Sequence, residues 1–563
     1  QKTLKKALSY RRKAATRPWQ LAGLKNTWQT HLPMTPKDQS SWHHIPDDGL
    51  TCDEVLALFE SQLLESFVPV QNPYFMGHMV TTIPASVHEA DIMISYLNQN
   101  MVKEETTGGA SCVEKLVLHW FHQLIYQRSD DYYEELYHIP SSNLAIMVHG
   151  GTMGNLTALT IARNHALQDV AQLGIAEALK IAKKKKMVIL SSERCHYSIT
   201  KITASLGLGQ NNLIKIPVNS DTQKICLTSL AKTIRYLEQD NVLIMACVVV
   251  ASSTETGSVD DLSDVAKICQ DHKIWMHVDA AWGGAYLLSA KLSPILAGIE
   301  QADSVIIDGH KLLGLTMGGG MVFLKDPKSP DVISQSSTYV LREDSRDSGR
   351  YHLEGSRPFY ALKLWILCQR KGKLGLARLV EVTHKRARIF QKILLSMTDF
   401  IQTTPLETNL LTYIWCPNDL RSLFQSDPSH QASLWMFQCL NRIQDHIHHL
   451  GWSRKIAGFV SKTELTLNFY GYPRHLTVLR AIPAQATTTA WHMKDLLNDQ
   501  SKMASKFFAE EIASDYHTLL YYLDSLPCDS QYKNIFGRLL ARFSPKRPGH
   551  NHTNDTSKIS HIR

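Results

Sequence analysis

The chain has 563 residues, of which 44% are hydrophobic and 20% charged, and its formal net charge is +8 at pH 7. These values are typical of a globular protein with two or three domains and exclude a wholly disordered chain. No apolar run approaches the roughly eighteen residues that span a membrane, and the ten cysteines lack metal-ligand spacing, so we expect a cytoplasmic protein with reduced thiols and no metal site.

The positive charge lies at the two ends of the chain. Nine Lys or Arg residues precede the first acidic residue, Asp38, and residues 541–563 contain five bases and one acid. The basic arm 2–17 could contact nucleic acid or anionic lipid, but we interpret it as a solvated tail and expect no nucleic-acid partner. The polar stretch 544–563 is predicted to be disordered.

Strand-like and helix-like segments alternate through the middle of the chain. Strands are predicted at 144–148, 186–191, 242–250, 273–278, 304–308 and 321–324, and later at 465–469 and 477–480. Helices are predicted at 52–67, 156–169, 287–302 and 374–397. This alternation favours an α/β domain with a mainly parallel sheet.

Two charged residues at the ends of predicted strands form the most informative pair. Asp279 follows the strand 273–278, and Lys311, preceded by His310, follows the strand 304–308. Ligands of α/β sheets collect at the carboxyl ends of the strands. There a lysine can bind the aldehyde of pyridoxal phosphate (PLP), and a carboxylate can keep the pyridine nitrogen protonated. The pair therefore predicts a PLP enzyme.

A small-residue turn precedes the helix 156–169. Its sequence, His-Gly-Gly-Thr-Met-Gly-Asn at 149–155, connects a predicted strand to this helix. Backbone N–H groups at a helix start point at an anion with the helix dipole behind them, so the turn suits a phosphate group. Taken alone, such a turn could equally be a plain connection.

The motif His-Val-Asp-Ala-Ala-Trp-Gly-Gly at 277–284 and the segment 307–321 resemble those of the group II PLP-dependent decarboxylases. This family includes glutamate, aromatic amino acid and histidine decarboxylases. Segments 72–79, 97–104 and 353–358 are most similar to its bacterial aspartate 1-decarboxylase branch. The resemblance covers residues 72–495. It implies the type I, aspartate aminotransferase-like fold, with helices on both faces of the sheet and a smaller C-terminal α+β domain.

The resemblance also implies roles for individual residues. Lys311, Asp279 and His196 are the implied catalytic residues, with His196 stacked on one face of the cofactor ring and Ala281 on the other. Contacts to the cofactor phosphate are implied for Thr152, Gly154 and Asn155 in the turn 149–155. Thr254 is expected near the phenolic oxygen of the cofactor. The complete implied cofactor set is Thr152, Gly154, Asn155, His196, Thr254, Asp279, Ala281, His310 and Lys311.

The resemblance further implies an α-decarboxylase of an acidic amino acid, with aspartate giving β-alanine ahead of glutamate giving γ-aminobutyrate. A carboxylate substrate needs hydrogen-bond donors, and the candidates are His78, Asn98, Asn100 and Arg357. Arg357 could instead form an ion pair at a subunit interface, and the two asparagines could cap helix ends. Another PLP lyase or aldehyde-forming enzyme on this fold, and a cofactor-binding protein without turnover, remain alternatives.

Many family members protonate the reacting carbon from a tyrosine on a loop of the partner subunit. Here the segment 337–351 is shorter, and Tyr339 and Tyr351 align with the flanks of that loop, so His196 or a displaced tyrosine would supply the proton. The family also implies a homodimer that acts on a small-molecule amino acid.

We expect four regions along the chain. They are an N-terminal basic arm and helical dimerisation segment (1–110), a large PLP-binding domain (111–375), a small C-terminal domain (376–543) and a disordered tail (544–563).

Overall fold

The computed structural model describes residues 44–64, 67–139, 142–337, 341, 345–426 and 431–512. The basic arm, the C-terminal tail and Tyr339 lie outside these residues, so the expectations for them stay predictions. Within the described ranges, no helix has both the length and the apolar character needed to cross a membrane.

The N-terminal region is helical. It comprises α3 (Cys52–Leu58), which continues into a π-helical turn (Phe59–Leu63), and then α4 (Ala85–Leu97), α5 (Glu104–Thr107), α6 (Gly109–Tyr126) and α7 (Asp130–His138). Thr51 caps α3, because its side chain accepts a hydrogen bond from the Glu54 N–H while the Glu54 carboxylate accepts one from the Thr51 N–H. This helix covers the first part of the predicted stretch 52–67.

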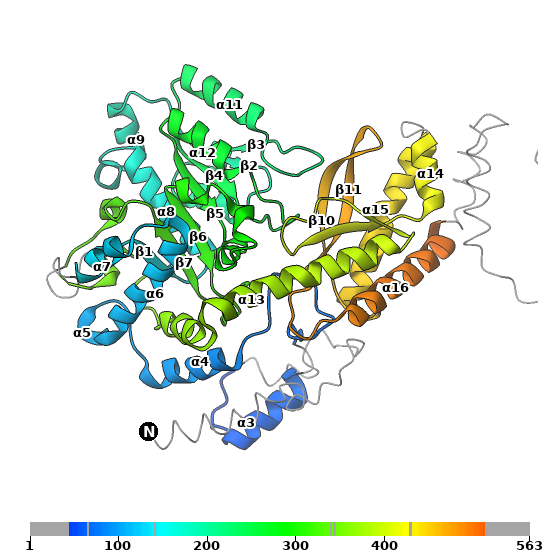
Figure 1. Ribbon diagram of the computed structural model, residues 1–563, viewed down its shortest axis with the longest axis horizontal. Coiled ribbons are helices and arrows are strands. Elements are labelled where there is room, and N and C mark those ends of the chain that lie inside the picture. Colours follow the sequence, from blue (N-terminus) through cyan, green and yellow to red (C-terminus); the bar gives the residue numbers. More distant parts are fainter. Residues whose placement is uncertain are drawn as a thin grey trace, which may run out of the picture.

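A seven-stranded sheet forms the centre of the large domain (Figure 1). Its strands are β1 (Ala145–Val148), β2 (Met187–Ser192), β3 (Leu213–Ile216), β4 (Leu243–Val250), β5 (Trp275–Asp279), β6 (Ser304–Asp308) and β7 (Gly320–Leu324). Their order is β1-β7-β6-β5-β4-β2-β3, and all run parallel except β7, which pairs antiparallel with β1 and β6. The predicted parallel sheet is confirmed.

Helices cover both faces of this sheet. Neighbouring residues of β4 face opposite sides of the sheet and pack in different cores. Val249 packs in the core that contains residues of α6, α11 (Leu227–Gln239) and α12 (Leu262–Asp271). Val248 packs in the core of α8 (Gly151–Ala166), α9 (Val170–Ile181) and α10 (Ser198–Ser205). Burial on both faces explains why the central strands are continuous apolar runs.

The predicted helix 287–302 is wrong. This connection between β5 and β6 consists of three short 3₁₀ segments, Gly283–Leu288, Ser293–Leu296 and Ile299–Gln301. Pro294 is the second residue of the segment Ser293–Leu296 and would lack an N–H in the middle of a helix 287–302. Gly298 has a φ of +96°, which an α-helix does not allow. A Cβ atom at Gly298 would also lie 2.4 Å from the Ser263 backbone nitrogen, so the backbone packs too closely there for a side chain.

A second domain contains an antiparallel sheet and the helices that cover it. The strands are β8 (Phe400–Gln402), β9 (Leu411–Trp415), β10 (Ser461–Phe469) and β11 (Tyr472–Ala481), in the order β10-β11-β9-β8. The helices are α14 (Asn418–Ser426), α15 (Gln431–Trp452) and α16 (Ala490–Phe507), and a π-helical turn (Phe508–Ile512) follows α16. This arrangement is the smaller α+β domain that the resemblance implies.

The long helix α13 (Ala361–Ser396) runs from the large domain to the small one (Figure 1). Gly372 interrupts it with a φ of +59°, and the predicted boundary at residues 375 and 376 falls shortly after this kink. Leu376 and Val380 pack in the main core of the large domain, whereas Ala387, Phe390 and Leu394 pack in the core of the small domain.

Candidate active site

A cavity of about 260 Å³ opens where the parallel strands end. Val250, Asp279 and Asp308 are the last residues of β4, β5 and β6, and the strand register brings these ends to one edge of the sheet. The cavity lining includes eight of the nine residues implied for cofactor binding: Thr152, Asn155, His196, Thr254, Asp279, Ala281, His310 and Lys311.

A directed chain of hydrogen bonds ends on Asp279. The Trp275 indole N–H donates to the Ser304 hydroxyl oxygen (2.8 Å), which lies 2.8 Å from His277 Nδ1. His277 Nε2 lies 2.8 Å from Asn155 Oδ1, and Asn155 Nδ2 donates to Asp279 Oδ2 (3.0 Å). Asn155 Oδ1 can only accept, so with His277 neutral the Nε2–H donates to Asn155 and Nδ1 accepts from the Ser304 hydroxyl.

Burial keeps His277 neutral, because it lowers the pKa of this imidazole to about 4. The Ala281 N–H also donates to Asp279 Oδ1 (3.2 Å), so the Asp279 carboxylate is fixed by donors on both oxygens. This geometry orients the carboxylate as a hydrogen-bond acceptor beside the cavity.

The start of α8 presents backbone N–H groups to the same cavity. Gly150, with a φ of +108°, precedes the helix, and Gly150, Gly151 and Thr152 all line the cavity. The first N–H groups of a helix have no intrahelical acceptor and attract an anion.

Gly154 and Asn155, the other implied phosphate contacts, have different partners. The Gly154 N–H donates to the Gly150 carbonyl, and a Cβ atom at Gly154 would lie 2.1 Å from Ile306 Cδ1, so this glycine allows close packing of α8 on the sheet. The Asn155 side chain bonds to His277 and Asp279. The anion-facing donors are therefore those of the first helical residues.

His196 lies in the turn between β2 and α10. Its Nδ1 is 2.8 Å from the Ser198 hydroxyl oxygen, and its ring lines the cavity. Burial lowers the pKa of this imidazole, while the Asp279 carboxylate opposes that shift. A partly buried imidazole ring is suited to cover the face of a flat ligand.

Lys311 lies on a tight loop between the antiparallel strands β6 and β7. The Gly309 N–H donates to the Gly319 carbonyl (2.9 Å), and His310 Nδ1 lies 2.9 Å from the same oxygen. The Lys311 amine points to Asp308, with 3.2 Å between Nζ and Oδ2. Asp308 was not among the predicted site residues, although its position at a strand end, three residues before Lys311, was a usable signal.

The residues implied for substrate binding do not line the cavity within this chain. Asn98 has a left-handed conformation (φ +46°) and ends α4, which is a helix-capping position. Asn100 hydrogen-bonds to Ser356 and to the Arg357 backbone N–H. His78 is exposed, and it precedes Met79, which does line the cavity.

Arg357 is committed to a buried ion pair. Its side chain is 1% exposed and forms two hydrogen bonds to the Glu114 carboxylate, one of them 2.7 Å long, and a third to Ser348. The ion-pair interpretation of Arg357 therefore fits its position, but both partners belong to the same chain rather than to two subunits.

Replacing Arg357 with Met is expected to lower the free energy of unfolding by about 3–5 kcal/mol, because Glu114 would keep a buried charge without its partner. Chemical denaturation measures this loss, and the double variant Arg357→Met/Glu114→Met should recover part of it. An unchanged stability together with a raised KM would instead identify Arg357 as a substrate contact.

Arg480 was not singled out from the sequence. This β11 residue is 8% exposed, its Nε has no hydrogen-bond partner, and it forms no ion pair with any residue that the structure describes. Burial lowers the pKa of its guanidinium to about 10, against the opposing charge of Glu255. The pKa of His78 is also lowered, first by desolvation of its ring, although the residue is partly exposed, and second by the charge of Arg480. A buried cation of this kind is suited to receive an anionic ligand group.

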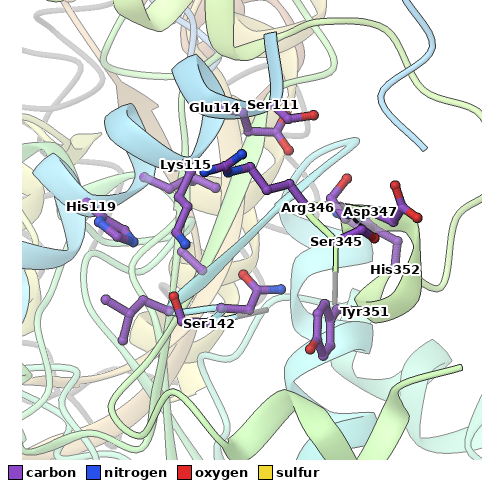
Figure 2. A pocket seen from close by; sticks show the side chains of 15 residues that line it. Ser111, Glu114, Lys115, His119, Ser142, Ser345, Arg346, Asp347, Tyr351 and His352 are labelled. Atoms are coloured by element: carbon purple, nitrogen blue, oxygen red, sulfur yellow. Dashed lines mark hydrogen bonds between the residues drawn. The ribbon is translucent and has the colours of Figure 1, made fainter. Parts of the chain in front are cut away.

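Tyr351 lies in a different pocket, which Figure 2 shows. This second pocket has a volume of about 60 Å³ and is lined by residues that include Lys115, Arg346 and His352. Tyr351 is buried there and does not line the Lys311 cavity. As a proton donor within its own chain, Tyr351 is therefore badly placed.

The residues of the main cavity fit pyridoxal phosphate. The Lys311 amine suits the aldehyde of this cofactor, and the oriented Asp279 carboxylate suits its pyridine nitrogen. The His196 imidazole can cover the ring face, and the open start of α8 can bind the phosphate. The unpartnered Oδ1 atom of Asp308 is a further polar group at this site.

Comparisons with known proteins agree with this fit. Residues 36–413 match the model of the pyridoxal-dependent decarboxylase conserved domain. The aspartate 1-decarboxylase of Aliivibrio fischeri is 34% identical over 451 residues, which are 79% of this chain and 81% of that protein. Human cysteine sulfinic acid decarboxylase is 28% identical over 298 residues, or 52% of this chain and 59% of that one.

Solved structures show the same fold. The apo crystal structure of mouse CSAD superposes with a TM-score of 0.73 at 20% identity, over 90% of this chain and 99% of that one. The fold predicted from the sequence is thereby confirmed, as are the enzyme class and the cofactor. The chain belongs to the family of pyridoxal phosphate-dependent amino acid decarboxylases.

Proposed function

We propose that this enzyme removes the α-carboxylate of L-aspartate and releases carbon dioxide and β-alanine. The similarity to the aspartate 1-decarboxylase of Aliivibrio fischeri supports this substrate. The observation that carries the choice of an acidic amino acid is Arg480, a buried guanidinium that lacks an ion-pair partner among the described residues.

In this proposal the residues that would contact the cofactor have separate tasks. Lys311 binds the cofactor through its amine, and the first N–H groups of α8 together with Thr152 hold the phosphate. Asp279 keeps a proton on the pyridine nitrogen, and His196 and Ala281 cover the two faces of the ring. When bound, the cofactor supplies the sink for the electron pair that the departing carboxylate leaves behind.

The side-chain carboxylate of the substrate, which stays on the product, would bind between Arg480 and His78. The Ile482 N–H, two residues after Arg480, donates to the Met76 carbonyl, two residues before His78, so the two segments lie side by side, and Met79 beside His78 lines the cavity. A guanidinium can hold a carboxylate through two parallel hydrogen bonds, and an imidazole can add a third. His196 is the proposed proton donor to the reacting carbon, since Tyr351 lies in the second pocket.

We also propose that the chain acts as a homodimer in the cytoplasm. Asn98 and Asn100 lie outside the cavity of their own chain, so a substrate contact by either would be made in the partner subunit. The nine cysteines among the described residues are all free, in keeping with a reducing compartment. Light scattering of the purified protein tests the dimer against the chain mass of 63.6 kDa.

Separate incubations with L-aspartate, L-glutamate and L-cysteine sulfinate test the substrate. Carbon dioxide and the organic product are measured in each case. β-Alanine from aspartate alone is the expected result. γ-Aminobutyrate from glutamate would show that glutamate is the substrate, and an aldehyde product would identify an aldehyde-forming enzyme instead.

Replacing Arg480 with Gln is expected to raise the KM for aspartate by about 10- to 100-fold, because a charge-assisted hydrogen bond contributes roughly 1.5–3 kcal/mol. The absorbance of the bound cofactor should stay unchanged, since Arg480 does not line the cofactor cavity. Arg474→Gln, on the same strand, is the matched control. An unchanged KM in Arg480→Gln would remove the basis for an acidic substrate.

A further inference from the structure

The carboxyl group of Asp308 lies inside the cofactor cavity, but the proposed function gives it no task. Its side chain is 1% exposed, Oδ2 lies 3.2 Å from the Lys311 amine, and Oδ1 has no hydrogen-bond partner. Burial raises the pKa of this carboxyl, while the charges of Lys311 and His310 act against that shift. Asp308 is thus an ionisable group whose charge depends on what lies beside it.

This carboxyl group directly adjoins the start of α8. A Cβ atom at Gly151, the first residue of the helix, would lie 2.8 Å from Asp308 Oδ2. A Cβ atom at Gly320 would lie 2.8 Å from Asp308 Oδ1. Because both neighbours are glycines, no side chain separates the carboxyl group from the helix start. An anion bound at that start and the Asp308 carboxylate would be close neighbours.

Two anions at such a short distance cannot both keep their full charge without a large cost, and the usual result is that one of them takes a proton. We infer that Asp308 is ionised opposite the Lys311 ammonium group in the cofactor-free enzyme and takes up one proton when a phosphate group binds at the start of α8. This inference rests on the proposed position of the cofactor phosphate. The proton comes from solvent, and Lys311 keeps its own as long as the ligand carries no aldehyde.

The other titratable groups of the cavity are less suited to take this proton. Asp279 already accepts hydrogen bonds on both oxygens, from Asn155 and from the Ala281 N–H, so neither oxygen is free to be turned into a donor. His310 bonds through Nδ1 to Gly319, and its Nε2 lies 3.8 Å from Asp308 Oδ2.

Two further histidines line the cavity. His196 has a pKa lowered by burial, and His149 at the cavity wall pairs with Glu354. Asp308 alone among these groups has an acceptor oxygen without a donor. Once protonated, this carboxyl group can donate a hydrogen bond to a phosphate oxygen instead of repelling it.

Calorimetry of the full-length apoenzyme with pyridoxine 5′-phosphate, which lacks the aldehyde, tests the proposal. Titrations at one pH in two buffers of different ionisation enthalpy give the number of protons taken up. The wild type should take up close to one proton, and Asp308→Asn close to none. Asp303→Asn is the matched control, since Asp303 is a half-buried carboxylate at the other end of β6 whose pKa burial also raises, and it should retain the wild-type value.

A second measurement needs no variant. Between about pH 7 and pH 8 the ligand phosphate is already a dianion and its pyridine nitrogen still keeps its own proton, so uptake of one proton by Asp308 should raise the Kd of the wild type by about tenfold over this range. A flat pH profile of the wild type, or equal proton uptake in Asp308→Asn, would overturn the inference while the cofactor site stands. Failure of both pyridoxine 5′-phosphate and pyridoxal phosphate to bind would overturn the phosphate position and the inference with it.

Discussion

Replacing Lys311 with Ala is expected to abolish the visible absorbance of the lysine-bound cofactor and to lower the decarboxylation rate by about 10³-fold or more. Lys311 supplies the amine that lines the cavity, and its Nζ is held 3.2 Å from Asp308 on a loop that Gly319 closes. The variant should remain folded, because Asp308 can take up a proton once its partner is gone: burial already raises the pKa of this carboxyl, and the charge of Lys311 is the main influence that opposes the rise.

Absorbance spectra of the purified variant with added cofactor measure this loss. Lys291→Ala is the control, since this lysine is 80% exposed on the surface. Free cofactor that washes away from Lys311→Ala, together with normal binding by Lys291→Ala, is the expected pattern. A lysine-bound cofactor that persists in Lys311→Ala would assign the linkage to another lysine and refute the proposed site.

Asp279→Asn is expected to lower kcat by about 10²- to 10³-fold, the range found when one preorganised electrostatic group is removed from an active site. An amide of the same shape cannot stabilise a proton on the pyridine nitrogen, so the cofactor would draw electrons less strongly. Because Asn155 and Ala281 still surround the side chain, the variant should retain the cofactor.

Steady-state kinetics with aspartate, combined with the cofactor content of the protein, check this prediction. Asn155→Ala provides a graded comparison: it removes the donor that orients Asp279 but keeps the carboxylate, so its loss of kcat should be smaller. A variant Asp279→Asn with wild-type kcat would mean that another group protonates the nitrogen.

Six of the seven strands of the large sheet were predictable from the sequence, because each is a local apolar run, whereas the short, half-buried strand β3 (Leu213–Ile216) was not predicted. Segments such as 242–250 are continuous apolar runs, and β4 is buried on both faces between two layers of helices. The connection 287–302 has a helix-like composition, but its fold depends on Pro294, on the backbone angles of Gly298 and on the close approach of Ser263, which is distant in sequence.

The cofactor residues were predictable for a similar reason. Asp279 ends a strand and Lys311 directly follows one, so a local pattern and the geometry of parallel sheets bring them together. Roles that depend on contacts between distant segments were not predictable.

Arg357 is a clear case, because its carboxylate partner Glu114 lies 243 positions away in the sequence. Asn155 resembles a phosphate contact by its place in the turn 149–155, but its amide bonds to Asp279, 124 positions away.

The shared helix α13 has a consequence for how such a chain can change over evolution. One residue inserted between Val380 and Ala387 would rotate everything after it by about 100° and shift it by about 1.5 Å. Phe390 and Leu394 would then leave the small-domain core, unless that whole domain turned with them relative to the large one. The number of residues between Val380 and Ala387 therefore fixes how the two domains are oriented relative to each other. We expect relatives to have no insertions or deletions in this stretch of helix.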